Sequence, residues 1–268
     1  MNESEMLRVS ELKRASATDL DIQTGISFFE PHLRYFIDQT LEVGGEVYLA
    51  GPSEGPAEGI FIYDGAEKTG TIYTRSQKAL NCLLNLKQPK YLFAELSVER
   101  EREIYDIYVT NLKSLDVSHQ FSHEVTIAKE DETDELERFM SLTHQGVNKQ
   151  WVRAALKNRD RCFVIRLKNE IAGLGWVTFV NNVGRIHSLH VLPQYRRIGL
   201  GQDILFARLL WLKARGARSA YSEISRHNTS SSRIAMKGGM GVAGQIFLYL
   251  CNEPNSGTKV VCDQPIKS

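Results

Sequence analysis

The sequence predicts an α+β fold built on a mixed α/β sheet, and three observations support this. Short apolar or alternating runs, typical of strands, are interspersed with helical patterns along the whole chain. A strand, a tight glycine turn and an apolar-striped helix follow one another at residues 186–214. The length of 268 residues exceeds the usual size of one domain, so two halves are expected.

We expect residues 1–118 to form an N-terminal domain. A helical pattern with apolar residues three and four apart runs from Leu7 to Leu41 and ends at Gly44-Gly45. Ile104, Ile107, Tyr108 and Leu112 give residues 99–112 the spacing of an amphipathic helix. The other expected elements are strands at 46–50, 59–63, 69–74 and 91–96, a turn at 51–56 and a helix at 76–86.

Residues 119–268 are predicted to form the second domain, joined to the first by a polar link at 113–122. In the helix expected at 202–214, the leucines 205, 209 and 212 form a core face, and Gly216 fits a left-handed C-terminal cap. The other expected elements are helices at 131–142 and 148–157, strands at 125–128, 162–167, 171–181, 185–191, 222–228 and 245–250, hairpin turns at 169–170 and 182–184, and a polar tail at 252–268.

The charges are unevenly distributed along the chain. Residues 1–120 carry 12 lysines and arginines against 19 aspartates and glutamates, whereas residues 121–268 carry 21 against 13. A basic half suits a polyanionic ligand, and an acidic half suits a cationic amine. There is no basic cluster with interleaved aromatic residues, so nucleic acid is not expected as a partner.

Cysteine and histidine spacing argues against a metal site. The four cysteines form no C-x-x-C pair, and the seven histidines show no zinc-binding spacing. No apolar run reaches the roughly 20 residues that span a bilayer, and the acidic N-terminus does not resemble a signal peptide. We therefore expect a cytoplasmic protein with no metal and no membrane partner, and leave its oligomeric state open.

The turn at residues 191–201 reads Val-Leu-Pro-Gln-Tyr-Arg-Arg-Ile-Gly-Leu-Gly. Such a loop directs backbone N–H groups toward one point at a helix N-terminus, where phosphate or pyrophosphate binds. Glycine allows the anion to approach the backbone closely. A dinucleotide loop would require a third glycine where Ile204 stands, and a Walker loop would require Lys-Ser/Thr after Gly201. An ordinary strand-to-helix turn remains the alternative.

The motif Arg196-x-x-Gly199-x-Gly201 closely resembles the acyl-CoA loop of the GNAT superfamily of N-acyltransferases, whose pattern is [Gln/Arg]-x-x-Gly-x-[Gly/Ala]. Residues 222–228 resemble the family's fifth strand, which ends in an asparagine that contacts the cofactor, and residues 237–240 resemble the end of its next helix. The resemblance covers about residues 123–250 and implies a GNAT-like fold there.

The order of elements in the N-terminal half also looks like a GNAT half. After the strand at 69–74, however, Arg75-Ser76-Gln77-Lys78 stands where the glycine loop would be. We therefore expect two GNAT-like halves, of which the first is degenerate and lacks an acyl-CoA site. An unrelated α+β domain is the alternative for the first half.

The resemblance implies an acyl-CoA-dependent N-acetyltransferase, which moves an acetyl or other short acyl group to an amine by direct attack. Acetyl-CoA would be the acyl donor, and the acceptor, a small molecule or a protein amine, is not identified. The alternatives are a non-catalytic acyl-CoA-binding sensor or interaction module and a protein that keeps only the fold. The implied cofactor-binding residues are Leu189, His190, Val191, Arg196, Arg197, Ile198, Gly199, Leu200, Gly201, Gln202 and Asn228.

Histidines in the strand before the loop are the first candidates for a general base, because the pKa of histidine lies near neutral pH. Strand alternation places His187, Leu189 and Val191 on one face, and Ile186, Ser188 and His190 on the other. The catalytic candidates are His187, His190 and Glu223, in that order; the arylalkylamine branch of the family carries a functional histidine at the position of His187.

The family often carries a tyrosine seven residues after the asparagine, as the acid that protonates the CoA thiolate. Here that position is Ala235. Ser231, Ser232, Tyr221 or water are the candidates to replace the tyrosine, unless the thiolate leaves unprotonated.

Overall fold

The computed structural model describes Lys13, Arg14, Ile37, Thr40, Pro89 and residues 45–50, 59–65, 68–74, 76–84, 91–94, 102–115, 118–143, 149–157 and 160–250. Most of the helix expected from Leu7 to Leu41 lies outside these residues. So do the turn at 51–56 and the tail at 252–268.

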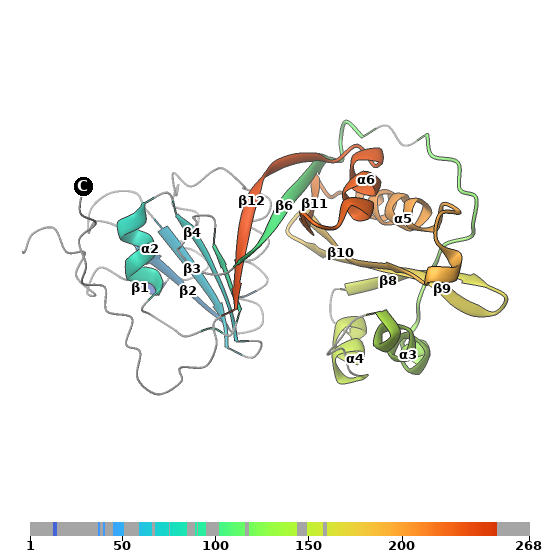
Figure 1. Cartoon of the computed structure of the whole chain (residues 1–268), viewed down its shortest axis with the longest axis horizontal. Helices are drawn as coiled ribbons and strands as arrows, with labels where there is room; N and C mark the ends of the chain where they lie inside the picture. The colour runs from blue at the N-terminus through green and yellow to red at the C-terminus, as the bar shows by residue number, and fades with distance from the viewer. Residues whose placement is uncertain are drawn as a thin grey trace, which may run out of the picture. The chain divides into compact units, whose positions relative to one another are not determined.

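The chain divides into two compact units, which are drawn in Figure 1. The first unit contains Met1–Tyr105 and Gln245–Ser268, and the second contains Asp106–Gly244. Two strands, β6 (Arg102–Asn111) and β12 (Gly241–Leu250), have residues in both units. The domain boundary at 118/119 stays a prediction, and the compact units are divided differently because the chain returns to the first unit near its end.

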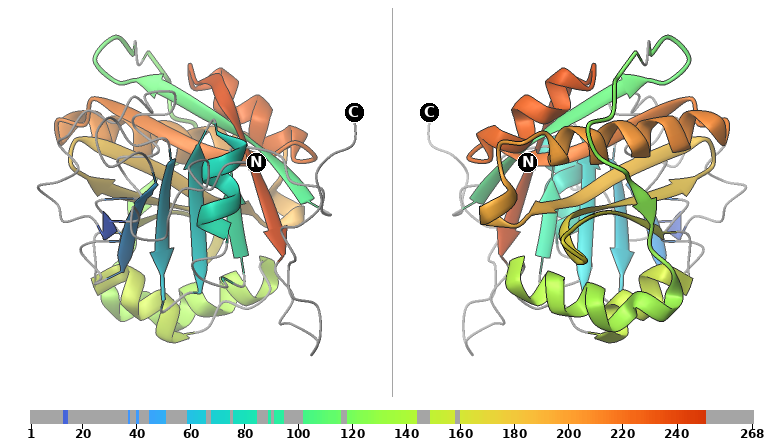
Figure 2. Two further views of the ribbon diagram at one scale, coloured as in Figure 1. Left: turned by 90° about the vertical axis from the view of Figure 1, so that its left-hand side faces the viewer. Right: turned by 90° about the vertical axis from the view of Figure 1, so that its right-hand side faces the viewer.

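The sheet of the first unit has the strand order β1-β2-β3-β4-β5-β12. The strands β2, β3 and β4 are antiparallel, whereas β5 is parallel to β4 and antiparallel to β12. The helix α2 (Gln77–Leu84) makes the crossover and packs on one face of the sheet with Ala79, Leu80 and Leu83 (Figure 2). The strands of this unit are β1 (Lys13–Arg14), β2 (Glu46–Ala50), β3 (Gly59–Asp64), β4 (Thr69–Thr74) and β5 (Tyr91–Ala94). The sequence predictions for β2 to β5 and for α2 are confirmed, whereas β1 is a strand where a helix was expected.

The sheet of the second unit has the strand order β6-β11-β10-β9-β8-β7. Here too three antiparallel strands, β8, β9 and β10, precede a crossover helix and a parallel strand, β11. The bounds are β7 (Thr126–Ile127), β8 (Asp160–Leu167), β9 (Glu170–Val180), β10 (Val183–Val191) and β11 (Ser219–Ser225). The two units therefore repeat one topology.

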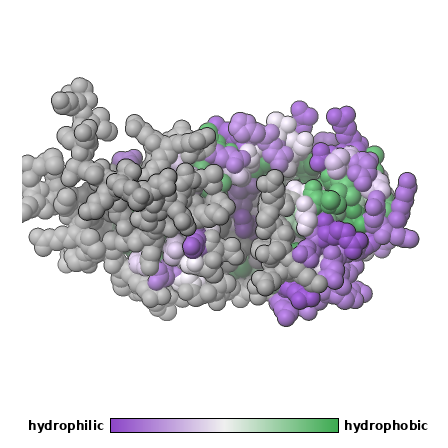
Figure 3. Space-filling model, turned by 60° about the horizontal axis from the view of Figure 1, so that its bottom comes forward, coloured by the Kyte–Doolittle hydropathy of each residue, from purple (hydrophilic) through white to green (hydrophobic). Residues whose placement is uncertain are grey.

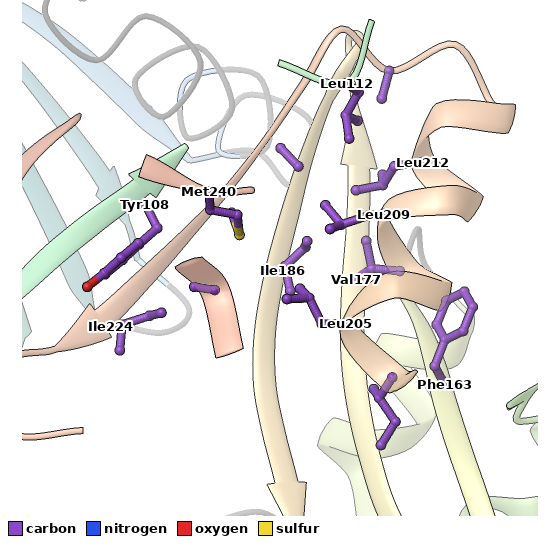
Figure 4. Close-up of a cluster of buried hydrophobic side chains, with 14 of the residues drawn as sticks. Tyr108, Leu112, Phe163, Val177, Ile186, Leu205, Leu209, Leu212, Ile224 and Met240 are labelled. Carbon is purple, nitrogen blue, oxygen red and sulfur yellow. The ribbon is translucent and has the colours of Figure 1, made fainter. Parts of the chain in front are cut away.

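Helices cover both faces of the second sheet (Figure 1). On one face, α3 (Thr133–Thr143, after a short 3-10 turn at Glu130–Glu132) and α4 (Lys149–Lys157) pack over Leu174 and Trp176. On the other face lie α5 (Leu200–Ala214) and α6 (Thr229–Lys237). Figure 4 shows Leu205, Leu209 and Leu212 of α5 directed at the sheet residues Val177 and Ile186.

The helix expected at 99–112 is wrong, because residues 102–111 form the strand β6. Ile104, Ile107 and Tyr108 fit a helical spacing, but residues 104–110 are almost entirely β-branched or aromatic, which favours a strand. Tyr108 and Leu112 are buried in the core of the second unit. As a strand beside β11, this segment buries Tyr108 in the core, so tertiary packing and strand propensity favour the same structure.

The two hairpin turns of the second unit lie one residue earlier than expected. Positive φ angles occur at Lys168 and Asn169 (52° and 64°) and at Asn181 and Asn182 (43° and 67°). Two consecutive left-handed residues form the turn that matches the twist of a two-residue hairpin. Glu170, Val183 and Gly184, which we expected in turns, are therefore strand residues.

Close packing between α5 and β10 depends on Gly184. A Cβ atom at this position would overlap the side chain of Leu212. We expect Gly184→Ala to lower the free energy of unfolding by about 1–3 kcal/mol, because overpacking displaces a buried side chain. Gly65→Ala is the control, since its Cβ would lie 3.5 Å from the Tyr63 ring, an ordinary contact. Equal urea midpoints for the two variants would contradict this account.

Candidate active site

The loop between β10 and α5 has the geometry of an anion site. After a 3-10 turn at Pro193–Tyr195, Gly199 caps α5 with φ +96°. The carbonyl of Gly199 accepts hydrogen bonds from the N–H groups of Gln202 (2.9 Å) and Asp203 (3.1 Å). Helical geometry gives the preceding N–H groups, those of Leu200 and Gly201, no acceptor within the helix. These groups and the positive end of the helix dipole are therefore available to an anion.

The surroundings of the loop fit a pyrophosphate. Arg196, Arg197, Ile198 and Gly199 are exposed, and nothing lies within 4 Å of a Cβ built on Gly199. Arg197 adopts φ +68°, which a residue with a side chain rarely takes. The Nε of Arg196 donates to the carbonyl of Val191 (3.1 Å), which ties the loop to the end of β10. The loop combines an open backbone, two arginines and a helix N-terminus.

Gly201 has a different role from Gly199. It is buried, and a Cβ atom there would lie 2.9 Å from Cδ1 of Ile234 in α6. This glycine therefore permits α6 to pack against the start of α5, whereas Gly199 supplies the left-handed turn and the open approach.

β10 contains a bulge directly before the loop. His187 lies opposite Trp176 of β9, but His190 lies opposite Leu174, so three steps on β10 correspond to two on β9. Ser188, with φ +48°, and Leu189 have no partner in this register. A bulge interrupts the ladder of hydrogen bonds and turns backbone groups away from the neighbouring strand. This part of β10 is therefore suited to bind a ligand through its backbone.

The bulge makes the expected alternation wrong from Leu189 onward, for Leu189, His190 and Val191. Trp176 and Leu174 lie two residues apart and both belong to the core cluster under α3 and α4. His187 and His190, their partners, therefore lie on this same face of the sheet. Leu189 and Val191 pack on the other face, against the cluster beneath α5.

His187 belongs to a chain of hydrogen bonds. Its Nε2 lies 3.2 Å from Oγ1 of Thr178, and Thr178 Oγ1 is hydrogen-bonded to Oδ1 of Asp160. The Nδ1 atom lies 3.3 Å from the hydroxyl of Ser188. While Asp160 is ionised, the Thr178 hydroxyl donates to it and can only accept from His187, so the proton of a neutral His187 is on Nε2. Nδ1 then carries the lone pair.

The environment keeps His187 neutral. Burial and the neighbouring Arg185 guanidinium hold the pKa of His187 well below its usual 6.5, although Glu223 acts in the opposite direction. Burial raises the pKa of Asp160, and its hydrogen bond with Thr178 acts against this rise. His187 can therefore accept a proton without first losing one, but its lowered pKa makes it a weaker base than a histidine with the near-neutral pKa expected from the sequence.

The other two catalytic candidates have different surroundings. Glu223 forms an ion pair with Arg185 (3.2 Å), and its side chain is 10% exposed. His190 is half-buried on the same face as His187. Cys162 also lies on this face, but burial raises the pKa of its thiol well above the ordinary value, so it is no nucleophile at neutral pH.

Asn228 lies at the end of the helix α6 nearest β11. Its side-chain oxygen accepts a hydrogen bond from the N–H of Ser231 (3.1 Å), and this caps the helix. The amide NH₂ of Asn228 stays free for another acceptor in this cap geometry. Ser232 donates its hydroxyl to the carbonyl of Asn228 (3.2 Å). Ala235 is buried in the core beneath α6, and Tyr221 is buried in β11.

A cluster of two histidines and one aspartate behind the loop was not predicted from the sequence. The carboxylate of Asp203, in the first turn of α5, contacts Nε2 of His119 (2.7 Å) and Nδ1 of His123 (2.8 Å). Burial would raise the pKa of Asp203, but the hydrogen bonds from His123 and His119 outweigh it, so this pKa lies below its usual value. His123 and His119 lie 80 and 84 residues before Asp203 in the chain, so no local sequence pattern could reveal these contacts. The cluster holds the start of α5 in place.

In the first unit, the N-terminus of the crossover helix α2 corresponds to the start of α5, and a side chain caps it. The hydroxyl of Ser76 accepts a hydrogen bond from the N–H of Ala79 (3.3 Å) at the start of α2. The register between β3 and β4 runs without a shift from Gly59 opposite Thr74 to Asp64 opposite Thr69. Among the residues that the structure describes, the bulge and the open glycine loop thus occur together in the second unit.

Figure 3 shows one face of the molecule, where the described surface is mostly hydrophilic and hydrophobic side chains appear in small patches. Ile198 of the loop (51% exposed) and Met236 of α6 (55%) are large exposed hydrophobic residues. None of the described helices has the length and apolar composition to cross a bilayer. The described residues contain no group of three or more His, Cys, Asp or Glu side chains arranged to hold a metal ion.

Comparison with solved structures shows the class of fold. A Drosophila protein superposes with a TM-score of 0.61 at 11% identity, over 90% of this chain and 98% of that one. A GCN5-related N-acetyltransferase from Kribbella flavida gives 0.57 at 12% identity, over 81% and 93%. A tandem GNAT protein from the clavulanic acid biosynthesis pathway gives 0.54 at 11% identity, over 91% and 99%. The predicted mixed-sheet, GNAT-like fold is confirmed.

Residues 121–238 match the model of the acetyltransferase (GNAT) family. This match covers the part of the chain that carries the loop motif and agrees with the resemblance that the motif shows. A search among curated proteins gave no match.

Stability should depend on pH through His187. Its pKa in the folded protein lies well below that of an unfolded histidine, near 6.5, so the unfolded chain binds more protons below that pH. We expect the free energy of unfolding to fall as the pH drops below 6.5, by at most about 1.4 kcal/mol per pH unit from this group. Urea titrations between pH 8 and 5 should give a flatter profile for His187→Gln. Identical profiles would contradict a neutral His187 in the folded protein.

Proposed function

We propose that this protein is an acyl-CoA-dependent N-acetyltransferase, which transfers an acetyl or other short acyl group from acetyl-CoA to an amine by direct attack. The proposal depends above all on one observation: the bulge of β10 leads directly into an open anion loop at the start of α5. The match of residues 121–238 to the GNAT family model supports acyl transfer in general.

The loop supplies the binding energy for the donor. Backbone N–H groups at the start of α5 and the exposed Arg197 would hold the pyrophosphate, and the NH₂ of Asn228 would donate to the cofactor nearby. The unpaired backbone of Ser188 and Leu189 would bind the thioester carbonyl, where negative charge develops during attack. This arrangement orients the acyl group without a cysteine nucleophile.

His187 is the proposed base. It lies on the α3/α4 face beside the bulge, is neutral, and presents Nδ1 as the acceptor nitrogen. Thr178 and Asp160 fix this tautomer, so they orient the base. Proton removal from the ammonium form of the acceptor would produce the nucleophilic amine.

A non-catalytic acyl-CoA-binding module is the second candidate. The position of the family's tyrosine acid is Ala235, which is buried in the core beneath α6. The two functions predict different outcomes when acetyl-CoA is mixed with a panel of amines. Release of free CoA thiol that depends on one of the amines supports the enzyme, and saturable binding without any release supports the module.

We expect one acetyl-CoA to bind per chain, at the loop of the second unit. The hydroxyl of Ser76 already occupies the start of α2, whereas the start of α5 is open. Calorimetric titration with acetyl-CoA should give a stoichiometry of one. Two sites per chain would contradict this proposal.

Gly199→Val should abolish that binding, because a branched side chain is strained at φ +96° and blocks the approach of the pyrophosphate. Gly216→Val is the matched control: Gly216 has φ +81°, equally open surroundings, and lies at the opposite end of α5. Both variants should lose stability, but only Gly199→Val should lose affinity for acetyl-CoA. An equal loss in both would show that strain in α5, rather than a blocked site, is responsible.

His187→Ala should lower turnover roughly 10²–10⁴-fold at neutral pH, with partial rescue at high pH where the amine is already deprotonated. Asp160→Asn should lower turnover less, because the base remains but its tautomer is no longer fixed. His190→Ala is the comparison on the same face. A larger loss of turnover in His190→Ala than in His187→Ala would assign the role of base to His190. An unchanged pH–rate profile in the double variant His187→Ala, His190→Ala would refute a histidine base.

A further inference from the structure

Arg208 is a buried cation in the middle of α5. It is 1% exposed, and no carboxylate of the described residues pairs with it. Burial lowers the pKa of Arg208 to about 9, so it remains charged at neutral pH. A buried charge is unfavourable unless hydrogen bonds compensate it. The position of those hydrogen bonds therefore indicates what the residue does.

The guanidinium of Arg208 binds both strands where the bulge begins. Nη1 donates to the carbonyl of Trp176 in β9 (3.0 Å) and to the carbonyl of His187 in β10 (3.1 Å). Nε donates to the carbonyl of Ile204, one turn earlier in the helix (3.2 Å). Trp176 and His187 are register partners and form the last pair before the register shifts. Arg208 thus connects α5 to the edge of the bulge.

Gly175 provides the space for this contact. A Cβ atom on Gly175 would lie 2.8 Å from Cζ and 2.9 Å from Nη1 of Arg208. The guanidinium could move away from such a Cβ only by giving up the carbonyls that satisfy it. Gly175 and Arg208 therefore form one structural unit, with the glycine on β9 and the arginine on α5.

We propose that Arg208 is a positioning residue for acyl transfer, which fixes the peptide group between His187 and Ser188 and thereby holds the bulge in its ligand-binding conformation. This inference rests on the proposed function, in which the bulge binds the thioester.

Two effects follow from the contact with His187. The C=O of His187 and the N–H of Ser188 belong to one peptide group, so a charged donor on the carbonyl polarises the N–H and makes it a stronger donor. The contact also fixes the backbone on which the imidazole of His187 is carried. Since α5 starts at the anion loop and holds the bulge two turns later, one helix sets the spacing between both parts of the donor site.

The first unit offers an internal comparison. Its crossover helix α2 packs on the sheet with Ala79, Leu80 and Leu83, and the register of β3 and β4 has no shift. Among the described residues, the bulge of β10 and the buried Arg208 beneath it thus occur together in the second unit.

The test compares three variants with the wild-type chain. Arg208→Met removes the charge and keeps much of the side-chain length; Arg208→Lys keeps a charge that can reach a carbonyl; Gly175→Ala keeps the arginine but displaces it. Arg215→Met, at the exposed end of α5, is the control for loss of an arginine from this helix. Each variant is measured for its urea midpoint, its affinity for CoA and acetyl-CoA, and kcat and KM with the amine that the wild type accepts.

We expect Arg208→Met and Gly175→Ala to lower kcat about 10–100-fold, as for the loss of one oxyanion donor or a small misplacement, with little change in the affinity for CoA, which the loop determines. Arg208→Lys should recover at least part of kcat, and Arg215→Met should match the wild type. Hydrogen exchange of the amides at residues 187–191 should become faster in Arg208→Met and Gly175→Ala, whereas exchange in β4 should not change.

A folded Arg208→Met with wild-type kcat and wild-type exchange at 187–191 would overturn the proposal. So would a parallel loss of stability, CoA affinity and kcat that Arg208→Lys does not relieve, since that pattern indicates a purely structural role. If Arg208→Met does not fold, Gly175→Ala decides by the same criteria. If the wild type binds acetyl-CoA but acetylates no amine, the proposed function fails, and the exchange measurement still decides whether Arg208 holds the bulge.

Discussion

The second unit must combine a continuous sheet with a strand whose backbone is open to a ligand, and the bulge of β10 meets both requirements. Up to His187, β10 pairs with β9 in one register, and from His190 it pairs with β9 in a register shifted by one residue. The extra residue brings both histidines to one face of the sheet and leaves Leu189 and Val191 to pack under α5. The arrangement of the candidate site therefore depends on this single irregularity.

An irregular strand inside a packed core leaves carbonyl groups that need donors. Arg208 satisfies two of them from the helix side, and Gly175 leaves room for the guanidinium. On the opposite face, hydrogen bonds link His187 through Thr178 to Asp160. The bulge is thus supported from both faces, by a buried cation on one and by a half-buried carboxyl group on the other.

Much of the fold was predictable because its signals are local. The glycine loop and the core face of α5 follow from short spacings in the sequence. The strand β6 was not predictable, because helical spacing and strand propensity disagree at residues 104–110. Pairing with distant strands decides between the two. The faces of His187 and His190 could not be derived either, since alternation assumes a regular strand and the bulge is fixed by Gly175 and Arg208, far away in the chain.

The path of β12 has a consequence for the order in which the protein folds. Residues 247–250 pair with β5, so the sheet of the first unit gains a strand from residues that follow the second unit in the chain. The second unit, by contrast, is continuous from Asp106 to Gly244. During synthesis the first unit must therefore wait for β12 until the whole second unit has left the ribosome. The N-terminal half is made first but is completed last, and until then β5 presents an unpaired edge.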